Sequence, residues 1–249
     1  MSKNIPRLRM FAGPNGSGKS TIKSVISSEL LGIYINPDEI EKETHKSGFL
    51  DFNAYKVTTT KQEVLDFFES SSLLKISTLE GKAQNLQFSE GKLIFHEIEA
   101  NPYFAAVAAD FIRNKLIETR QSFTFETVMS HPEKIDLLHK AQVMSYRTYL
   151  YYVATEDPSI NISRVQNRVK MGGHPVPEDK IISRYHNSLD LLINAIQKTH
   201  RAYIFDNSTP ELLFVAEITN GKDLEMKTDQ TPAWFKKAVL DKLKNKNKS

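Results

Sequence analysis

Nine consecutive residues near the N-terminus, GPNGSGKST, combine glycines, a lysine and hydroxyl side chains at a spacing suited to binding phosphate. The string matches the pattern GxxxxGK[ST], in which the backbone N–H groups of a glycine-rich loop surround phosphate oxygens. We expect Lys19 to reach the β- and γ-phosphates of a nucleotide and the Ser20 hydroxyl to hold Mg²⁺. The alternative is a chance glycine-rich turn. The candidate nucleotide-binding residues are Gly13, Pro14, Asn15, Gly16, Ser17, Gly18, Lys19, Ser20 and Thr21, with Ser20 as the metal ligand.

A carboxylate follows the second predicted strand, in the string YINPDEI. Ligands of an open α/β sheet bind beyond the carboxyl ends of its strands, so Asp38 should face the γ-phosphate region. A carboxylate there can orient an attacking hydroxyl and take its proton. The alternative is that Asp38 is the N-cap of a helix that begins at Glu39. Glu39 and Glu41 are the other nearby carboxylates, and they are less well placed as bases.

The string SFTFETVMS carries a second carboxylate and two hydroxyls at the end of another predicted strand. Glu126 interrupts a row of apolar strand residues, where a charge needs a partner, and it is a candidate contact for a substrate or for a magnesium-bound water. Thr127 and Ser130 are candidates for binding a polar substrate. Alternatively, they only cap the next helix, because Ser130 with Glu133 has the spacing of a capping box.

Three arginines and a histidine are spread over a helix, a turn and the next helix. Arg164 and Arg168 are spaced i, i+4, so both side chains project from one helix face. His174 lies in the turn GGHPVP, and Arg184 lies on the following helix. Guanidinium groups brought to a γ-phosphate stabilise the transition state, and a helix–loop–helix that closes excludes water. The alternative is a solvated basic face that pairs with acidic residues of the second helix.

Composition excludes several classes of site. The chain has 249 residues with 40% hydrophobic and 25% charged residues, as expected for a globular protein. It lacks cysteine, which excludes disulfides, thiolate nucleophiles, iron–sulfur clusters and sulfur-ligated zinc. Neither a signal peptide nor an apolar run long enough for a membrane span is evident, so we expect a soluble, cytoplasmic protein without membrane association.

The net charge of +3 invites a nucleic-acid interpretation, but its location argues against one. Residues 236–249 hold six lysines and one aspartate, so the rest of the chain carries a net charge of −2. The basic excess is therefore the solvated end of a C-terminal helix, and we expect no nucleic-acid partner.

Strands that alternate with helices predict a parallel sheet with right-handed crossovers. The predicted strands are residues 8–12, 32–35, 122–126, 147–155 and 202–208, and the main predicted helices are residues 19–30, 105–118, 132–144, 157–171 and 177–196. Residues 46–98 break this alternation with a helix in KQEVLDFFESS and a hairpin at 85–98 around Ser89, Glu90 and Gly91. We predict a core of residues 1–45 and 99–210, an α+β insertion of residues 46–98, and a C-terminal extension of residues 211–249 with a hairpin around Asn220 and Gly221.

The ordered set GPNGSGKST, INPDEI, SFTFETVMSHPEK, LYYVATEDPSINISRVQNRVKMGGHPVPEDKIISRY and AYIFDNS resembles the zeta toxin-like phosphotransferases of the P-loop kinase class. The resemblance covers most of residues 5–210 except the insertion. It implies a three-layer α/β fold with a five-stranded parallel sheet in the order 2-3-1-4-5. It also implies ATP- and Mg²⁺-dependent transfer of a phosphate to a hydroxyl of a small substrate, which in the best-known members is UDP-N-acetylglucosamine. An antitoxin or another protein is an implied partner.

The resemblance also assigns roles to individual residues. Asp38 matches the catalytic carboxylate, Lys19 and Ser20 match the phosphate and magnesium ligands, and Glu126 matches a substrate-contacting acid. Arg164 matches the first of two phosphate-binding arginines. The second falls near His174, where this chain has no arginine, so Arg168 or Arg184 is expected to replace it.

Two other functions use the same parts. A polynucleotide 5′-hydroxyl kinase would need a basic groove with aromatic stacking residues. A non-catalytic protein would use ATP as a structural ligand or switch and the insertion as a docking module. A regulatory GTPase and a transport ATPase are disfavoured, because the chain has no NKxD, DxxG or LSGGQ-like string.

Overall fold

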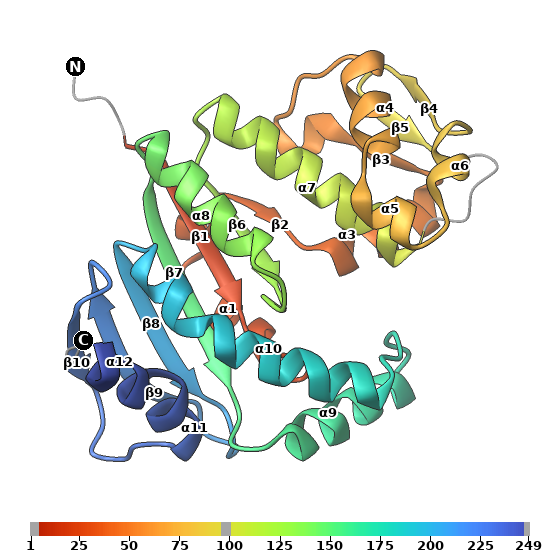
Figure 1. Ribbon diagram of the computed structural model, residues 1–249. Helices are drawn as coiled ribbons and strands as arrows, with labels where there is room; N and C mark the ends of the chain where they lie inside the picture. The colour runs from red at the N-terminus through yellow and green to blue at the C-terminus, as the bar shows by residue number, and fades with distance from the viewer. Residues whose placement is uncertain (1–4, 96–100, 247–249) are drawn as a thin grey trace. The chain divides into compact units, whose positions relative to one another are not determined.

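The computed structural model describes residues 5–95 and 101–246 of an α/β protein (Figure 1). The chain divides into two compact units. The first unit comprises Met1–Leu31 and Glu126–Ser249, and the second comprises Gly32–Phe125. Unit 1 contains the glycine-rich loop, and unit 2 contains Asp38 and the predicted insertion.

The sheet of unit 1 is parallel at its centre. Strand β1 (Arg7–Ala12) pairs with β7 (Arg147–Ala154), which pairs with β8 (Arg201–Asp206), all in parallel. Leu8, Met10, Leu150 and Tyr152 of β1 and β7 are fully buried, as the nearly continuous apolar runs predict. Strands β9 (Leu213–Thr219) and β10 (Asp223–Met226) then extend the sheet in antiparallel pairing.

The helices of unit 1 follow the predicted alternation, with one break. The predicted helix 19–30 is divided into α1 and α2, because Ile26 adopts an extended conformation (φ −103°, ψ 132°). Helix α9 begins where expected, since the Asp157 side chain accepts a hydrogen bond from Ser159 N and Pro158 takes the first helical position. The helices are α1 (Lys19–Val25), α2 (Ser28–Leu31), α8 (Glu133–Val143), α9 (Pro158–Lys170), α10 (Glu178–Gln197), α11 (Ala233–Phe235) and α12 (Asp241–Lys246), with a π-helical segment (Lys236–Leu240) between the last two.

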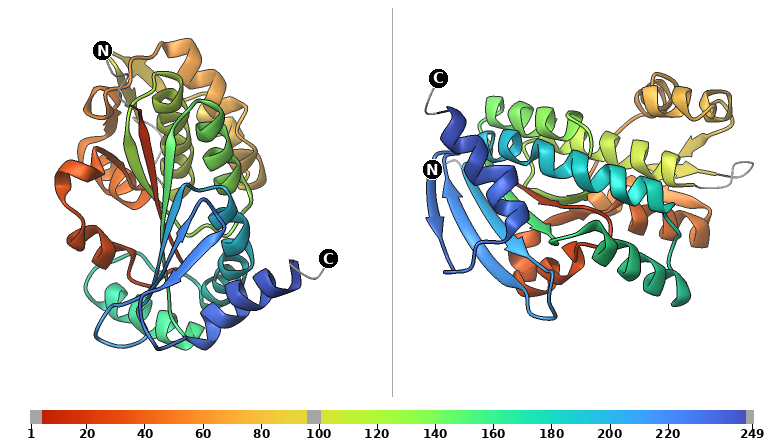
Figure 2. Two further views of the ribbon diagram at one scale, coloured as in Figure 1. Left: turned by 90° about the vertical axis from the view of Figure 1, so that its left-hand side faces the viewer. Right: turned by 60° about the horizontal axis from the view of Figure 1, so that its bottom comes forward.

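Helix α10 and the C-terminal helical segment lie side by side and cover one face of the unit 1 sheet (Figure 2). The Tyr152 hydroxyl of β7 is 3.0 Å from Ser188 Oγ of α10, and its ring lies 6.1 Å from that of Trp234. The Trp234 indole donates a 2.6 Å hydrogen bond to Asp206 Oδ2 at the end of β8. The C-terminal extension is therefore part of the unit 1 core.

Unit 2 has a parallel strand pair and a small second sheet. Strand β2 (Ile33–Ile35) pairs with residues 123–125 of β6 (Phe123–Thr127). In the second sheet, β5 (Lys92–Ile94) lies between β3 (Phe49–Asp51) and β4 (Gln87–Ser89). The helices are α3 (Pro37–Ser47), a 3-10 helix (Phe52–Tyr55), α4 (Lys61–Glu69), α5 (Ser72–Ile76), α6 (Glu80–Ala83) and α7 (Pro102–Glu118).

The secondary structure predicted for the insertion agrees with these elements. Glu90 and Gly91 turn the β4–β5 hairpin with φ values of 50° and 78°. The last residues of the predicted hairpin, 96–98, lie outside the described part of the chain. The insertion bounds 46–98 stay a prediction, since the compact unit that contains them is the longer Gly32–Phe125.

The strand neighbours found within each unit fit the predicted order. Predicted strands one, four and five are adjacent as β1, β7 and β8, and predicted strands two and three are adjacent as β2 and β6. The complete order 2-3-1-4-5 stays a prediction. Over residues 5–95 and 101–246, no helix combines the length and apolar content needed to cross a membrane.

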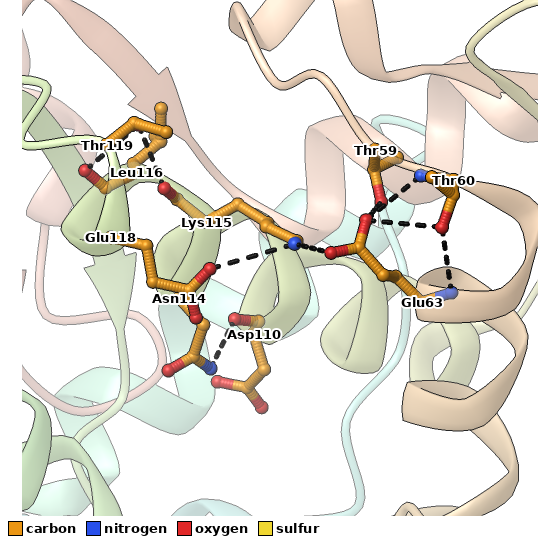
Figure 3. A network of polar contacts seen from close by, with 9 residues as sticks. All are labelled: Thr59, Thr60, Glu63, Asp110, Asn114, Lys115, Leu116, Glu118 and Thr119. Carbon is orange, nitrogen blue, oxygen red and sulfur yellow. Dashed lines mark hydrogen bonds and ion pairs between the residues drawn. The ribbon is translucent and has the colours of Figure 1, made fainter.

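A polar network ties α4 of unit 2 to α7 (Figure 3). Glu63 and Thr60 form a capping box at the start of α4, in which Thr60 N donates to Glu63 Oε2 at 3.0 Å. Lys115 of α7 places its ammonium 2.5 Å from Glu63 Oε1. Hydrogen bonds from Lys115, Thr60 and Thr59, in that order, lower the pKa of Glu63 from 4.5 to about 2.

Replacing this carboxylate should change how stability depends on pH. Because the folded-state pKa is depressed, the Glu63 interactions stabilise the protein above the ordinary pKa of 4.5 and are lost as the pH falls towards about 2. We expect Glu63→Gln to lower Tm at pH 7 and to lower it much less at pH 2. Thermal unfolding at both pH values measures this. Glu69→Gln, an exposed change at the end of the same helix, is the control, and an E63Q deficit as large at pH 2 as at pH 7 would contradict the assignment.

Candidate nucleotide-binding site

The glycine-rich loop lies between β1 and α1 of unit 1, the position that a phosphate-binding loop requires. Gly18 precedes α1 with φ 103°, a left-handed conformation open to glycine. The Lys19 ammonium is folded back over the loop and donates to Gly13 O at 2.8 Å and to Pro14 O at 2.9 Å. A cation is therefore held at the loop, where phosphate oxygens would replace these carbonyl contacts.

Two asparagines from segments distant in sequence donate hydrogen bonds to carbonyl oxygens of the loop. Asn161 of α9 donates through Nδ2 to Asn15 O at 2.6 Å, and Asn207, directly after β8, donates through Nδ2 to Ser17 O at 2.8 Å. Asn161 is fully buried and Asn207 is 8% exposed. The sequence alone predicts no role for either asparagine. Both occur in strings that carry the family resemblance, but nothing in their spacing indicates a contact with the loop.

Two loop glycines are required by these close approaches. A Cβ at Gly16 would lie 2.6 Å from Asn161 O, and a Cβ at Gly18 would lie 2.1 Å from Asn207 Nδ2. Contacts this short exclude any side chain unless the neighbour moves, which is the backbone of Asn161 at Gly16 and the side chain of Asn207 at Gly18. The glycines therefore allow α9 and the end of β8 to reach the loop, in addition to freeing its backbone.

The three candidate arginines make different contacts in the structure. Arg184 of α10 places Nη1 3.5 Å from Asn15 Oδ1, at the loop. Arg168 donates through Nη2 to His174 O at 3.1 Å and packs against Gly173, so it organises the α9–α10 turn. Arg164 Nη1 is buried and has no hydrogen-bond partner within the described residues. His174 itself is exposed.

Tyr185 fixes α10 next to these groups. Its hydroxyl donates to the carbonyl oxygens of Thr155 at 2.7 Å and Glu156 at 3.1 Å, beyond the end of β7. Burial, and then the negative charges of Glu156 and Asp157, raise the pKa of Tyr185. The phenol is therefore neutral at physiological pH and acts as a donor that anchors the helix carrying Arg184.

The contacts of the residues at and after the end of β6 differ in one respect from those predicted, which is the capping of the next helix. Glu126 is buried with 8% exposure, while Thr127 and Ser130 are half-buried. Thr127 Oγ1 accepts a 3.0 Å hydrogen bond from Met129 N, which shapes the turn. The predicted capping box of Ser130 with Glu133 is wrong. Helix α8 begins at Glu133 after Pro132 and has no side-chain cap, because the chain reaches the helix through this proline rather than from Ser130.

Asp38 is not the N-cap that the alternative interpretation supposed. Asn36 is the cap and accepts a 2.9 Å hydrogen bond from Asp38 N through Oδ1, and Pro37 takes the first helical position of α3. Asp38 is exposed in the first turn, where the helix dipole favours a carboxylate. Asp38 lies in unit 2 and the glycine-rich loop in unit 1, so their meeting stays a prediction.

The metal prediction can be tested against the available ligands. Ser20 is exposed in the first turn of α1. Over residues 5–95 and 101–246, no three acidic or histidine side chains gather as a metal site. The Mg²⁺ ligand role of Ser20 stays a prediction.

Comparison with known proteins supports the family resemblance. Residues 102–216 match the family model described as zeta toxin. The match includes the candidate residues from Glu126 to Arg184 and leaves out the glycine-rich loop and Asp38. The predicted resemblance to zeta toxins is thus confirmed over this range. None of the curated proteins matches the chain.

Solved structures resemble the chain in fold. A chain in the crystal structure of AvrRxo1-ORF1:-ORF2 with ATP is 14% identical with a TM-score of 0.56, over 90% of this chain and 61% of that chain. The native complex gives 14% identity and a TM-score of 0.57, over 90% and 62%. A structure of the PezAT toxin–antitoxin system of Streptococcus pneumoniae is 13% identical with a TM-score of 0.47, over 100% and 88%.

The likeness to the two AvrRxo1 structures confirms the predicted α/β fold class. The chain spans about three fifths of the AvrRxo1 chains that it matches, with coverages of 61% and 62%. At 14% identity, the likeness shows the fold alone.

The close approach of α9 to the loop predicts unequal costs for two glycine substitutions in unit 1. Gly16 and Gly172 both have positive φ, 73° and 87°, but only Gly16 has a neighbour within 4 Å of the added Cβ. We expect Gly172→Ala to cost about 1–2 kcal/mol of unfolding free energy from the left-handed conformation. Gly16→Ala should cost about 1–3 kcal/mol more from overlap with Asn161. Urea denaturation measures both, and equal losses would contradict the close approach.

Proposed function

We propose, from the zeta toxin match over residues 102–216, that this chain is an ATP-dependent phosphotransferase that moves the γ-phosphate to a hydroxyl of a small substrate. The observation that carries the proposal is the strand–loop–helix at Gly13–Thr21, with the Lys19 ammonium bonded to Gly13 O and Pro14 O. Such a loop binds the phosphates of a nucleotide. One of the similar crystal structures contains ATP, which supports ATP as the nucleotide.

The residues of unit 1 have defined tasks in this proposal. The loop N–H groups and Lys19 bind the phosphates, and the Ser20 hydroxyl would hold Mg²⁺, which when bound neutralises charge between the β- and γ-phosphates. Arg164 and Arg184 supply guanidinium groups to the transferring phosphate. Arg164 has a buried Nη1 without a partner among the described residues, and Arg184 reaches Asn15, so both guanidiniums retain donors for an anion.

The acceptor side is proposed from unit 2 and the end of β6. Asp38 accepts the proton of the attacking hydroxyl, and its exposed carboxylate at the start of α3 is accessible for this role. Glu126, Thr127 and Ser130 contact the substrate. A UDP-amino sugar is the proposed substrate class by resemblance to zeta toxins. An antitoxin-like protein partner is also proposed, since AvrRxo1-ORF1:-ORF2 is a complex.

Labelled ATP incubated with a metabolite extract tests the phosphotransferase proposal. We expect label from the γ-phosphate to appear in a new product, with UDP-amino sugars tested first. Lys19→Met should weaken ATP binding by about tenfold or more and remove the product, because the phosphates lose their cation. Asp38→Asn should retain ATP binding and lower kcat by about 10²–10⁴-fold.

Glu39→Gln is the matched control, because it makes the same chemical change at the neighbouring exposed carboxylate of α3. It should leave kcat near that of the wild type. The base assignment fails if E39Q loses activity and D38N does not. The enzyme assignment fails if no product forms that depends on Lys19.

Arg184, rather than Arg168, is proposed as the second phosphate-binding arginine. Arg168 is engaged with His174 O and Gly173, whereas Arg184 reaches the loop. We expect Arg184→Met to lower kcat by about 10²-fold with little change in Tm. Arg168→Met should lower Tm and change kcat less. Steady-state kinetics and thermal unfolding of both variants test this, and the reverse pattern would identify Arg168 instead.

A further inference from the structure

We infer that Asn161 and Asn207 are positioning residues that turn two peptide groups of the glycine-rich loop so that their N–H groups face the nucleotide. The inference rests on the proposed function for the identity of the ligand. Its geometric part rests only on unit 1, where Asn161 Nδ2 bonds Asn15 O and Asn207 Nδ2 bonds Ser17 O. We call these two side chains the amide clamp.

The planarity of the peptide bond links the direction of each carbonyl to that of the next N–H. In a trans peptide, the C=O of one residue and the N–H of the next lie in one plane and point in opposite directions. A side chain that fixes Asn15 O therefore fixes the N–H of Gly16 on the opposite side. In the same way, the bond to Ser17 O fixes the N–H of Gly18. The amide clamp thus holds two N–H donors of the loop directed away from α9 and β8.

The clamp is needed because the glycines alone would leave these two peptide groups free to adopt either orientation. Gly16 and Gly18 have the widest backbone freedom of any residue type, and a peptide next to a glycine flips easily. A flipped peptide would present a carbonyl oxygen, which repels phosphate, where an N–H is needed. Bonding the outer carbonyls removes the flipped state before the ligand arrives, and such preorganisation improves affinity without a new ligand contact.

A further contact fixes the side-chain amide of Asn161 and the backbone position of Asn207. Asn161 Oδ1 accepts a hydrogen bond from the buried Thr155 hydroxyl, so its Nδ2 must face Asn15. Asn207 donates its backbone N–H to Ala154 O at 2.9 Å, which places it in register with the end of β7. Asn161 of α9 is therefore tied to Thr155, directly after β7, and Asn207, directly after β8, is tied to Ala154 at the end of β7.

Isosteric variants test the clamp. Asn161→Asp and Asn207→Asp keep the side-chain shape, and N161D keeps the acceptor for Thr155, but each replaces the donor with an oxygen that repels the loop carbonyl. Asn187→Asp, the same change at an exposed position of α10, is the matched control. The measurements are hydrogen–deuterium exchange of the loop peptide without nucleotide, and the Kd for ADP by calorimetry.

We expect loop exchange to rise in N161D and N207D and not in N187D, and the Kd for ADP to weaken by about tenfold or more in the first two. A merely structural role would lower Tm and leave the Kd of the folded protein unchanged, and that result overturns the inference. Unchanged loop exchange overturns it as well. If N161D does not fold, Thr155→Val, which removes the hydroxyl bonded to Asn161 Oδ1 and, at 3.3 Å, to Asp157 O, should raise loop exchange to a smaller extent.

The test separates this inference from the proposed function. If the wild type binds ADP and the clamp variants bind it equally well, the clamp is wrong and the nucleotide assignment stands. If the wild type binds neither ADP nor ATP, while loop exchange still responds to the clamp variants, the nucleotide assignment is wrong and the clamp holds the loop for another anion, such as inorganic phosphate, whose binding the same calorimetry measures.

Discussion

The orientation of a few peptide groups between β1 and α1 is the constraint on which the rest of unit 1 depends. A loop that binds phosphate must present N–H groups on one side, and every carbonyl that shares a plane with them must then find a partner on the other. In this chain Asn161 and Asn207 provide partners for Asn15 O and Ser17 O. The loop is therefore defined by segments far from it in sequence as much as by its own glycines.

The C-terminal extension contributes to the same support. Asp206 precedes Asn207 at the end of β8, and its carboxylate accepts hydrogen bonds from Trp234 Nε1 at 2.6 Å and from Ser208 Oγ at 2.8 Å. Ser208 Oγ in turn accepts from Glu156 N at 2.8 Å, beyond the end of β7. These bonds fix the strand end from which Asn207 reaches the loop. Hydrogen bonds to a charged acceptor stabilise by about 1.5–3 kcal/mol each, so the extension anchors the site.

The features that the sequence predicted correctly are those determined by residues close together in the chain. The glycine-rich loop, the Asp157 cap of α9 and the Asn220–Gly221 hairpin each depend on neighbouring residues, and the structure has all three. The alternative interpretation of Asp38 as an N-cap failed, because Asn36 caps the helix and Pro37 takes its first position. The sequence could not predict the amide clamp, because Asn161 and Asn15 are 146 positions apart in the chain and Asn207 and Ser17 are 190 positions apart. A single sequence carries no signal for such pairs.

Unit 2 is held together in part by contacts between its helices. Helix α3 presents Asp38 in its first turn and packs against α7, whose Lys115 bonds Glu63 of α4. The added α+β elements are thus connected through α7 to the helix that carries the proposed base. Phe111 of α7 strengthens this connection, because its ring contacts those of Phe52 at 5.3 Å and Phe67 at 5.2 Å. A change in the insertion can therefore alter the surroundings of Asp38 through α7, while the glycine-rich loop depends on Asn161 and Asn207 in unit 1.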